Sequence, residues 1–347
     1  MDRELQKRKH RLMTQAGTRI FESRVALVTG AGSGIGRAEA IAFASLGARV
    51  VVNDLARGNP TSAERVVEEI RAAGGEALAA NASVSKAEGA AAIVSTAVDA
   101  WGRLDFLVNN AGFGRVSPIW ETTETEWDTV ISVNLKGSFL MAREASRVMR
   151  AQKFGVIINT SSESATGDNY FTSYMAAKEG VVGLTRGIAR DLLRDNVRCN
   201  AIRPRAFDTL QGTPVAWEKL KRFRETYGVS MSGPHPMGPV QGKAAEVAAI
   251  VAWLCSDDAV DITGRIFVAG CGEVGMWAEP TVVQPLINMD GWSLETLHAV
   301  RHLLSDGMRS PLLDLPTEAW DLIDDRYRGM LERAIQNQMN EPKTVAS

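Results

Sequence analysis

The stretch "RVALVTGAGSGIGRAEAIAFASLGARVVVNDLA", residues 24–56, decides the fold. Its glycines stand between two short apolar runs, and a helical pattern separates these runs. Gly30, Gly34 and Gly36 fall where the first run ends and the helix begins. Glycine lets the backbone approach a ligand without a Cβ in the way, and a helix N-terminus offers N–H groups to a phosphate. The stretch therefore predicts a strand, a phosphate-binding turn, a helix and a second strand.

The second apolar run, "VVVND", ends in Asp54, eighteen residues after Gly36. At this place in a dinucleotide-binding fold, a carboxylate accepts hydrogen bonds from the adenine ribose and repels a 2′-phosphate. No arginine follows directly, because the next residue is Leu55. The pattern favours NAD over NADP as the cofactor.

The rest of the chain repeats this alternation of short β-branched runs and longer helical patterns. Such alternation predicts an α/β fold with a doubly wound parallel sheet, a Rossmann fold with helices on both faces. We expect seven strands, each buried on both faces, at residues 24–29, 48–53, 76–80, 104–108, 155–160, 197–202 and 265–269.

Three segments are expected along the chain. Residues 1–22 form a basic N-terminal extension, and residues 23–272 form the NAD-binding domain. Residues 273–347 form a C-terminal extension that packs on the core or on a neighbouring subunit. Within the domain, residues 203–243 follow the sixth strand and would form a lid over the carboxyl ends of the strands.

The composition argues against several classes of protein and site. With 39 basic and 41 acidic residues the formal net charge is −2, which supplies no basic field for nucleic acid. No apolar run is long enough for a bilayer span or a secretory signal, so we expect a cytoplasmic protein without a membrane partner. Cys199, Cys255 and Cys271 form no CxxC pair, which argues against disulfides and a zinc site, and no metal is expected.

Tyr174 and Lys178 of "YMAAK" predict a proton-transfer site. Four residues apart, they lie one turn apart on one helix face, which places a cation beside a phenol. An unperturbed tyrosine titrates near 10, so carrying a proton at neutral pH requires stabilising the phenolate by about three pKa units, roughly 4 kcal/mol. We expect Lys178 and an oxidised nicotinamide to supply the positive charge.

Four motifs appear in a fixed order: "TGAGSGIG" at 29–36, "NNAG" at 109–112, "VNLKGSF" around Asn134, and "YMAAK" at 174–178. In these motifs the chain, from residue 24 to about 270, resembles the short-chain dehydrogenase/reductase family. The resemblance implies an NAD(P)-dependent oxidoreductase acting on CH–OH groups. Family members commonly assemble as homodimers or homotetramers through the helices around the fifth strand.

The resemblance also implies the role of each catalytic residue. Tyr174 would move the proton, and Lys178 would bind the nicotinamide ribose and lower the pKa of Tyr174. Asn134 would hold a water that relays protons to the lysine. A serine at the end of the strand "IINTSS" would polarise the substrate oxygen.

Two serines compete for that last role. Counting thirteen residues back from Tyr174, as is usual in the family, leads to Ser161, whereas aligning the strand end leads to Ser162. We choose Ser162, because a one-residue slip in a strand turns a side chain to the other face, while the following loop absorbs a deletion more easily. Ser161 would then be a hydrogen-bonding residue at the strand end.

The cofactor contacts implied by the resemblance are Gly30, Ser33, Gly34, Ile35, Gly36, Asp54, Ser83, Val84, Asn110, Ala111, Gly112, Tyr174, Lys178, Phe207 and Thr209. Several positions depart from the family pattern, among them "VAGCGE", which stands where the family often has Asp-Gly-Gly. Ser83 stands where an aspartate usually reaches the adenine, and Arg205 replaces the usual glycine after Pro204. Arg205 is either a substrate contact or a surface arginine.

The substrate is expected to be small and lipophilic, a hydroxyacyl thioester or a steroid-like alcohol or ketone. The lid mixes apolar side chains with the basic run of Lys219, Lys221, Arg222 and Arg224, which either meets phosphates or, as we favour, forms a solvated helix face. Similarity to bacterial (3R)-hydroxyacyl-CoA and hydroxysteroid dehydrogenases points the same way. Alternatives are an NADPH-dependent ketoreductase of a biosynthetic pathway and a catalytically silent dinucleotide-binding protein.

Overall fold

The computed structural model describes residues 19–56, 58–166, 170–206, 242–280, 289 and 291–299 of the 347-residue chain. These residues belong to two compact units. The first holds the described residues up to 206 together with 242–277. The second holds 278–280, 289 and 291–299, which include one short helix, α10 (Leu294–Ala299).

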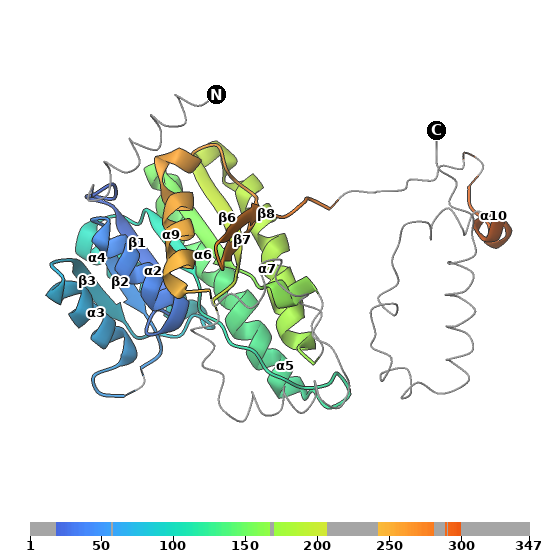
Figure 1. The fold of residues 1–347 in the computed structure, drawn as a ribbon, viewed down its shortest axis with the longest axis horizontal. Coiled ribbons are helices and arrows are strands. Elements are labelled where there is room, and N and C mark those ends of the chain that lie inside the picture. Colours follow the sequence, from blue (N-terminus) through green and yellow to red (C-terminus); the bar gives the residue numbers. More distant parts are fainter. Residues whose placement is uncertain are drawn as a thin grey trace. The chain divides into compact units, whose positions relative to one another are not determined.

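One eight-stranded sheet organises the first unit, in the order β3-β2-β1-β4-β5-β6-β7-β8 (Figure 1). Strands β1 to β7 pair in parallel, and β8 pairs with β7 in the antiparallel direction. The order reverses between β1 and β4, where an open α/β sheet leaves a ligand crevice at the carboxyl ends of its strands. The strands are β1 (Val25–Thr29), β2 (Arg49–Asn53), β3 (Glu76–Ala80), β4 (Phe106–Asn109), β5 (Gly155–Thr160), β6 (Val197–Pro204), β7 (Ile266–Gly270) and β8 (Glu273–Met276).

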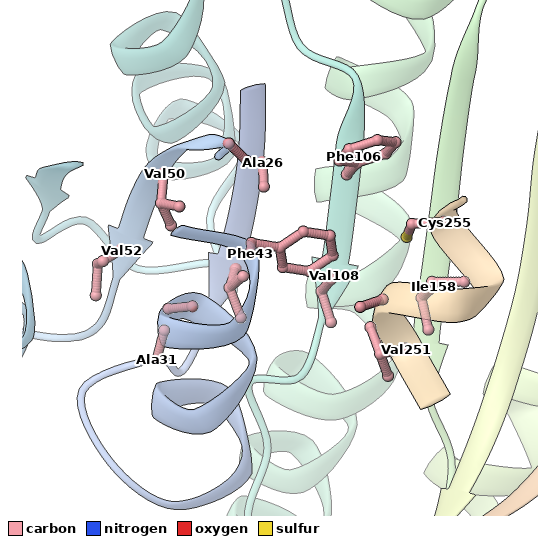
Figure 2. Close-up of a cluster of buried hydrophobic side chains, with 14 of the residues drawn as sticks. Ala26, Ala31, Phe43, Val50, Val52, Phe106, Val108, Ile158, Val251 and Cys255 are labelled. Carbon is pink, nitrogen blue, oxygen red and sulfur yellow. The ribbon is translucent and has the colours of Figure 1, made fainter. Parts of the chain in front are cut away.

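Helices cover both faces of the sheet, as the Rossmann prediction requires. One hydrophobic core joins the sheet to α2, α3 and α9, and Figure 2 shows Phe43 and Val251 of these helices over the strands. A second core lies on the opposite face, against α4, α6 and α7. The helices are α2 (Gly34–Ser45), α3 (Ser62–Ala72), α4 (Ala87–Trp101), α5 (Glu124–Ile131), α6 (Gly137–Gln152), α7 (Thr172–Asp191) and α9 (Ala244–Cys255). Among the described helices, none combines the length and apolar character that a membrane span needs.

The predicted fold class is confirmed, with two differences in detail. The strand β8 was not expected; it lies inside the segment predicted as a C-terminal extension and continues the sheet beyond β7. The second difference concerns burial: in β3, the edge strand, Glu76 is exposed and Leu78 and Ala79 are only partly buried. The expectation of seven strands buried on both faces was therefore wrong for β3.

The first unit reaches further toward the N-terminus than expected. Phe21, predicted to lie in the basic extension, is buried in the core on the α2 face. Its ring centroid lies 5.6 Å from that of Phe43 and 4.8 Å from that of Phe106. The hydrophobic core therefore includes residues before position 23.

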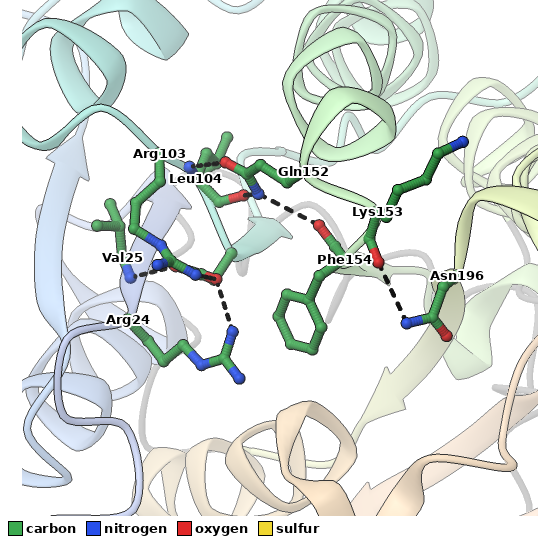
Figure 3. Close-up of polar contacts among 9 residues, drawn as sticks. Arg24, Val25, Arg103, Leu104, Gln152, Lys153, Phe154 and Asn196 are labelled. Atoms are coloured by element: carbon green, nitrogen blue, oxygen red, sulfur yellow. Dashed lines mark hydrogen bonds and ion pairs between the residues drawn. The ribbon is translucent and has the colours of Figure 1, made fainter.

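A buried carboxylate fastens the amino ends of β1 and β4, away from the carboxyl edge (Figure 3). Asp105 is fully buried and accepts hydrogen bonds from the Val25 amide at 2.9 Å, Arg24 at 3.0 Å and Arg103 at 2.8 Å. The Gln152 side chain both donates to and accepts from the backbone of Leu104, at 2.9 Å each. Because charge-assisted hydrogen bonds are short and strong, this end of the sheet is well fixed.

Candidate active site

The glycine-rich turn between β1 and α2 is packed so closely that side chains are excluded. Gly30 and Gly34 have φ of 63° and 59°, in the left-handed region that favours glycine. A Cβ at Gly30 would lie 2.7 Å from Ala111 Cα, and a Cβ at Gly36 would lie 2.4 Å from Asn110 Nδ2. Ser33 at the N-cap makes no capping hydrogen bond through its side chain, so it leaves the first N–H groups of α2 for another acceptor. The turn fits a diphosphate.

Asp54 lies beside this turn, after the end of β2. Its carboxylate accepts hydrogen bonds from Gly32 N at 3.0 Å and Leu55 N at 2.7 Å. The guanidinium of Arg37, on the first turn of α2, is bound to Glu69. This cation is therefore already paired, while the negative charge of Asp54 stands where an adenine ribose would lie.

Thr29 and Asn110 join the ends of β1 and β4 at the switch point. The Thr29 hydroxyl accepts hydrogen bonds from the N–H groups of Asn110 and Ala111, both at 3.1 Å. The Asn110 side chain donates to the carbonyls of Thr29 at 3.0 Å and Gly30 at 3.2 Å. Among the described residues its amide nitrogen thus supports the turn, a role for Thr29 and Asn110 that the sequence did not reveal.

The two candidate serines point in different directions. The Ser161 hydroxyl is buried and donates to the carbonyl oxygen of Lys178 at 2.8 Å. Ser162 is half-buried, and its side chain is hydrogen-bonded to that of Tyr174. The geometry thus brings Ser162, rather than Ser161, to the phenol.

Lys178 lies behind the tyrosine ring. Its Nζ is 5.6 Å from the Tyr174 ring centroid and donates to the carbonyl oxygen of Thr160 at 2.7 Å. The side chain is almost fully buried, and this burial lowers the pKa of Lys178 to about 8. At pH 7 the ammonium form still outnumbers the amine about tenfold, so a positive charge remains beside the phenol.

Burial acts on the pKa of Tyr174. It raises the pKa of this phenol above its ordinary value, because burial penalises the phenolate, and the hydrogen bond from Ser162 opposes the rise without cancelling it. The Lys178 ammonium near the ring donates to the Thr160 carbonyl.

Asn134 lies on a short π-helical segment, Ser132–Lys136, that joins α5 to α6. Its amide nitrogen donates to the carbonyls of Phe113 and Val130, both at 3.0 Å. Its Oδ1 is buried and finds no partner among the residues that the structure describes. A Cβ on Gly112 would lie 2.4 Å from this oxygen and 3.1 Å from Lys178 Nζ. The oxygen and the ammonium thus face the same small space, and a bridging water could satisfy both.

Aromatic residues flank Tyr174. A Cβ at Gly114 would lie 3.2 Å from the Phe171 ring and 3.8 Å from Tyr174 Cδ2. The Phe171 and Tyr174 ring centroids are 6.0 Å apart. Further along the same loop, Ile119 and Trp120 are exposed to 58% and 73%. The Phe171 ring gives the surroundings of Tyr174 an apolar character.

The other cofactor contacts expected from the sequence lie in the same region of the fold or outside the described residues. The Ser83 hydroxyl is hydrogen-bonded to that of Ser85 at 2.9 Å, and Val84 is buried near Gly137. Ile35 is half-buried in the first turn of α2. Phe207, Thr209 and the basic residues of the predicted lid lie outside the described residues.

Arg205 is not the solvated surface arginine of one of the two interpretations, because its side chain is only 19% exposed. Its guanidinium is paired with the carboxylates of Glu163 and Glu273. These partners stand far from it in the chain, and no local pattern could have identified them.

A model of the family described as Enoyl-(Acyl carrier protein) reductase matches residues 30–273, more than half of the chain. The chain belongs to the short-chain dehydrogenase/reductase family. Relatives in this family are named as dehydrogenases and reductases.

Three similar proteins illustrate the relationship. The Peroxisomal multifunctional enzyme type 2 of Mus musculus is 36% identical over 74% of this chain, but the match spans only 32% of that enzyme. The (2S)-((R)-hydroxy(phenyl)methyl)succinyl-CoA dehydrogenase subunit of Thauera aromatica is 35% identical over 74% of this chain and 99% of its own length. The crystal structure of a short chain dehydrogenase from Mycobacterium avium has a TM-score of 0.69 and 37% identity, covering 84% of this chain and 97% of that one.

Proposed function

We propose that this protein oxidises a secondary alcohol to a ketone, or reduces the ketone, with NAD(H) as cofactor. The observation that carries the proposal is the constellation around one phenol: Ser162 is hydrogen-bonded to Tyr174, and Lys178 lies behind the ring at 5.6 Å from its centroid. A hydroxyl donor, a proton carrier and a cation are the groups that this reaction needs around the substrate oxygen.

The residues at the carboxyl edge of the sheet fit NAD. The turn formed by Gly30, Ser33, Gly34, Ile35 and Gly36 would bind the diphosphate through its N–H groups. Asp54 would accept hydrogen bonds from the adenine ribose, which supports NAD over NADP.

Closer to the reaction, Gly112 and Lys178 would adjoin the nicotinamide ribose. When bound, NAD supplies the C4 atom of its nicotinamide as the hydride acceptor.

The proton is handled by the chain's own side chains. Ser162 would donate a hydrogen bond to the substrate oxygen, and Tyr174 would exchange the proton with it. Because burial alone raises the pKa of the phenol, ionisation of Tyr174 depends on positive charge close to the ring. Asn134 would then hold a water beside Lys178, through which that proton reaches solvent.

The substrate class follows from the apolar surroundings and from the relatives. The Phe171 ring lies near the Tyr174 ring, so an acyl or ring body would find apolar surface there. The Thauera aromatica relative is named for a CoA thioester. A hydroxyacyl thioester is therefore our first candidate, with a steroid-like alcohol as the second.

Location and assembly belong to the same proposal. We place the protein in the cytoplasm as a homodimer or homotetramer. Trp127 on α5 and Phe139 on α6 are exposed to 37% and 44%, and such apolar side chains on the helices before β5 support self-association. Size-exclusion chromatography with light scattering tests the assembly state.

The reaction is tested by following NADH absorbance with a panel of hydroxyacyl thioesters, hydroxysteroids and simple secondary alcohols. Tyr174→Phe keeps the ring but removes the proton carrier, so turnover should fall about 100-fold or more while NADH binding persists. Wild-type turnover in Tyr174→Phe would contradict the proposed mechanism. Binding of NAD without turnover of any substrate would indicate a silent dinucleotide-binding protein.

A matched pair of variants tests which of the two serines polarises the substrate oxygen. Ser162→Ala should lower kcat far more than Ser161→Ala, because only the Ser162 side chain is hydrogen-bonded to Tyr174. The reverse order would transfer the role to Ser161.

A further inference from the structure

Arg205 is held by two carboxylates at once. Its Nε donates to Glu163 Oε1 at 2.7 Å, and its Nη2 approaches the same oxygen at 2.6 Å. Its Nη1 donates to Glu273 Oε2. The Arg205 and Glu163 side chains are 19% and 22% exposed, so this ion pair is shielded from solvent more than a surface pair is.

The backbone of Arg205 is fixed as well. Its N–H donates to the carbonyl oxygen of Ala269 on β7 at 2.8 Å. A Cβ at Gly270 would lie 2.4 Å from Arg205 O, and a Cβ at Gly242 would lie 2.0 Å from it. The residue therefore has a set position from which its guanidinium reaches both partners.

Each of the two carboxylates that bind Arg205 belongs to the first residue of a secondary-structure element. Glu163 follows Ser162 directly and is the first residue of the 3-10 helix η2 (Glu163–Thr166). Glu273 is the first residue of β8, the strand that the sequence did not predict. Arg205 thus connects β8 to the turn that carries the candidate catalytic serine.

A second arginine makes a parallel connection. Arg203 is buried two residues earlier on β6 and donates to Glu179 at 2.7 Å. Glu179 directly follows Lys178, and the Arg203 guanidinium stacks on Trp277 at 4.4 Å from its centroid. Residues 273–277 therefore reach the neighbours of both Ser162 and Lys178, through Arg205 just after β6 and through Arg203 on β6.

We infer that Arg205 is a positioning residue, which holds the Ser162 turn against β8 so that the serine hydroxyl stays on the Tyr174 phenol. The inference rests on the proposed function, because it assigns Arg205 to the geometry of that site. It also makes β8 part of the active-site framework. A direct contact with an anionic substrate is disfavoured, because two carboxylates already surround the guanidinium.

The test compares Arg205→Met and Glu273→Gln with Glu76→Gln. Glu76 is a matched control, because its carboxylate is also paired with an arginine, Arg49, but at the far edge of the sheet. Arg205→Met and Glu273→Gln should lower kcat about tenfold, within the range for a misplaced catalytic group. The dissociation constant for NADH should stay unchanged, and the control should behave as wild type.

The pH profile separates positioning from mere stability. The hydrogen bond from Ser162 lowers the pKa of Tyr174. Weakening that bond through Arg205→Met or Glu273→Gln should therefore move the pH profile of kcat to higher pH. Arg205→Lys keeps a cation between the carboxylates and should recover part of the loss.

A double mutant identifies the route of the effect. If Arg205 acts through Ser162, adding Glu273→Gln to Ser162→Ala should cause little further loss of kcat. Wild-type kcat and pH profile in both Arg205→Met and Glu273→Gln would overturn the inference, as would a full additional tenfold loss on the Ser162→Ala background. A change confined to KM for anionic substrates would instead make Arg205 a substrate contact.

Two controls distinguish a failure of this inference from a variant that does not fold and from a failure of the proposed function. Thermal unfolding shows whether a variant folds; should Arg205→Met fail to fold, the partly exposed Glu273→Gln and the conservative Arg205→Lys decide the outcome alone. If Tyr174→Phe retains wild-type turnover, the proposed function fails first, irrespective of Arg205.

Discussion

Glu39 offers a sharp test of the structure, because its carboxyl group is buried without a partner. It lies on α2, whose buried face packs against α9, and is completely inaccessible to solvent. Neither carboxyl oxygen has a hydrogen-bond partner among the residues that the structure describes. Burial raises the pKa of Glu39 from 4.5 to about 8. The group should therefore be a neutral acid in the folded protein at pH 7.

The sign of the pH effect follows from proton binding. Between pH 4.5 and about 8 the unfolded chain has released this proton while the folded chain retains it. The unfolded state binds fewer protons in this window, so the free energy of unfolding falls as pH rises through it. At about 1.4 kcal/mol per pH unit, the loss amounts to about 3 kcal/mol at pH 7 and about 5 kcal/mol at pH 8.

Glu39→Gln keeps the shape of the side chain and removes the titration. The variant should be more stable than wild type by about 3 kcal/mol at pH 7, and by less than about 1 kcal/mol at pH 5. Urea unfolding at fixed protein concentration, at pH 5, 6, 7 and 8, measures the difference.

Glu68→Gln on the exposed face of α3 is the control, with an expected change within about 0.5 kcal/mol at every pH. A Glu39→Gln variant no more stable than wild type at pH 8 would refute the reasoning, because the carboxyl group would then be ionised at little cost.

Two further predictions concern the cofactor and the proton relay. Wild-type protein should bind NADH about tenfold or more tightly than NADPH, and Asp54→Ala should narrow that gap in a fluorescence titration; equal affinities in the wild type would contradict the choice of NAD. Gly112→Ala should lower kcat about tenfold or more, because its Cβ would lie 2.4 Å from Asn134 Oδ1 and 3.1 Å from Lys178 Nζ. Unchanged kcat in steady-state assays of that variant would show that the space between them carries no proton.

Much of the fold could be predicted, because parallel strands are continuous apolar runs that glycine turns and long helices separate. The seven parallel strands were expected close to their observed positions. The eighth, "EVGM", has four residues with a glycine among them, and half of its residues are exposed. A segment this short has too little apolar periodicity for a prediction, and only its pairing with β7 makes it a strand.

The candidate site was predicted less completely. Strand register separates the two serines, because register decides the face to which a side chain points, and the Ser161 hydroxyl donates to the Lys178 carbonyl. The partners of Arg205 could not be found, since Glu163 and Glu273 meet it only through the tertiary fold. The effect of burial on the pKa of Tyr174 could not be predicted for the same reason: helix spacing identifies Lys178 as a neighbour, but burial depends on what the fold places around the ring.

The antiparallel pairing of β8 with β7 also changes what this end of the sheet presents to other molecules. A strand without a partner exposes a row of N–H and C=O groups that can template pairing with another chain. Here β8 occupies those groups of β7, from Phe267 to Gly270. The outer strand within the described residues is then only four residues long and begins with a charged glutamate. Shortness and charge are features by which sheet proteins resist uncontrolled growth from their edges, so β8 leaves a shorter edge than an unpaired β7 would.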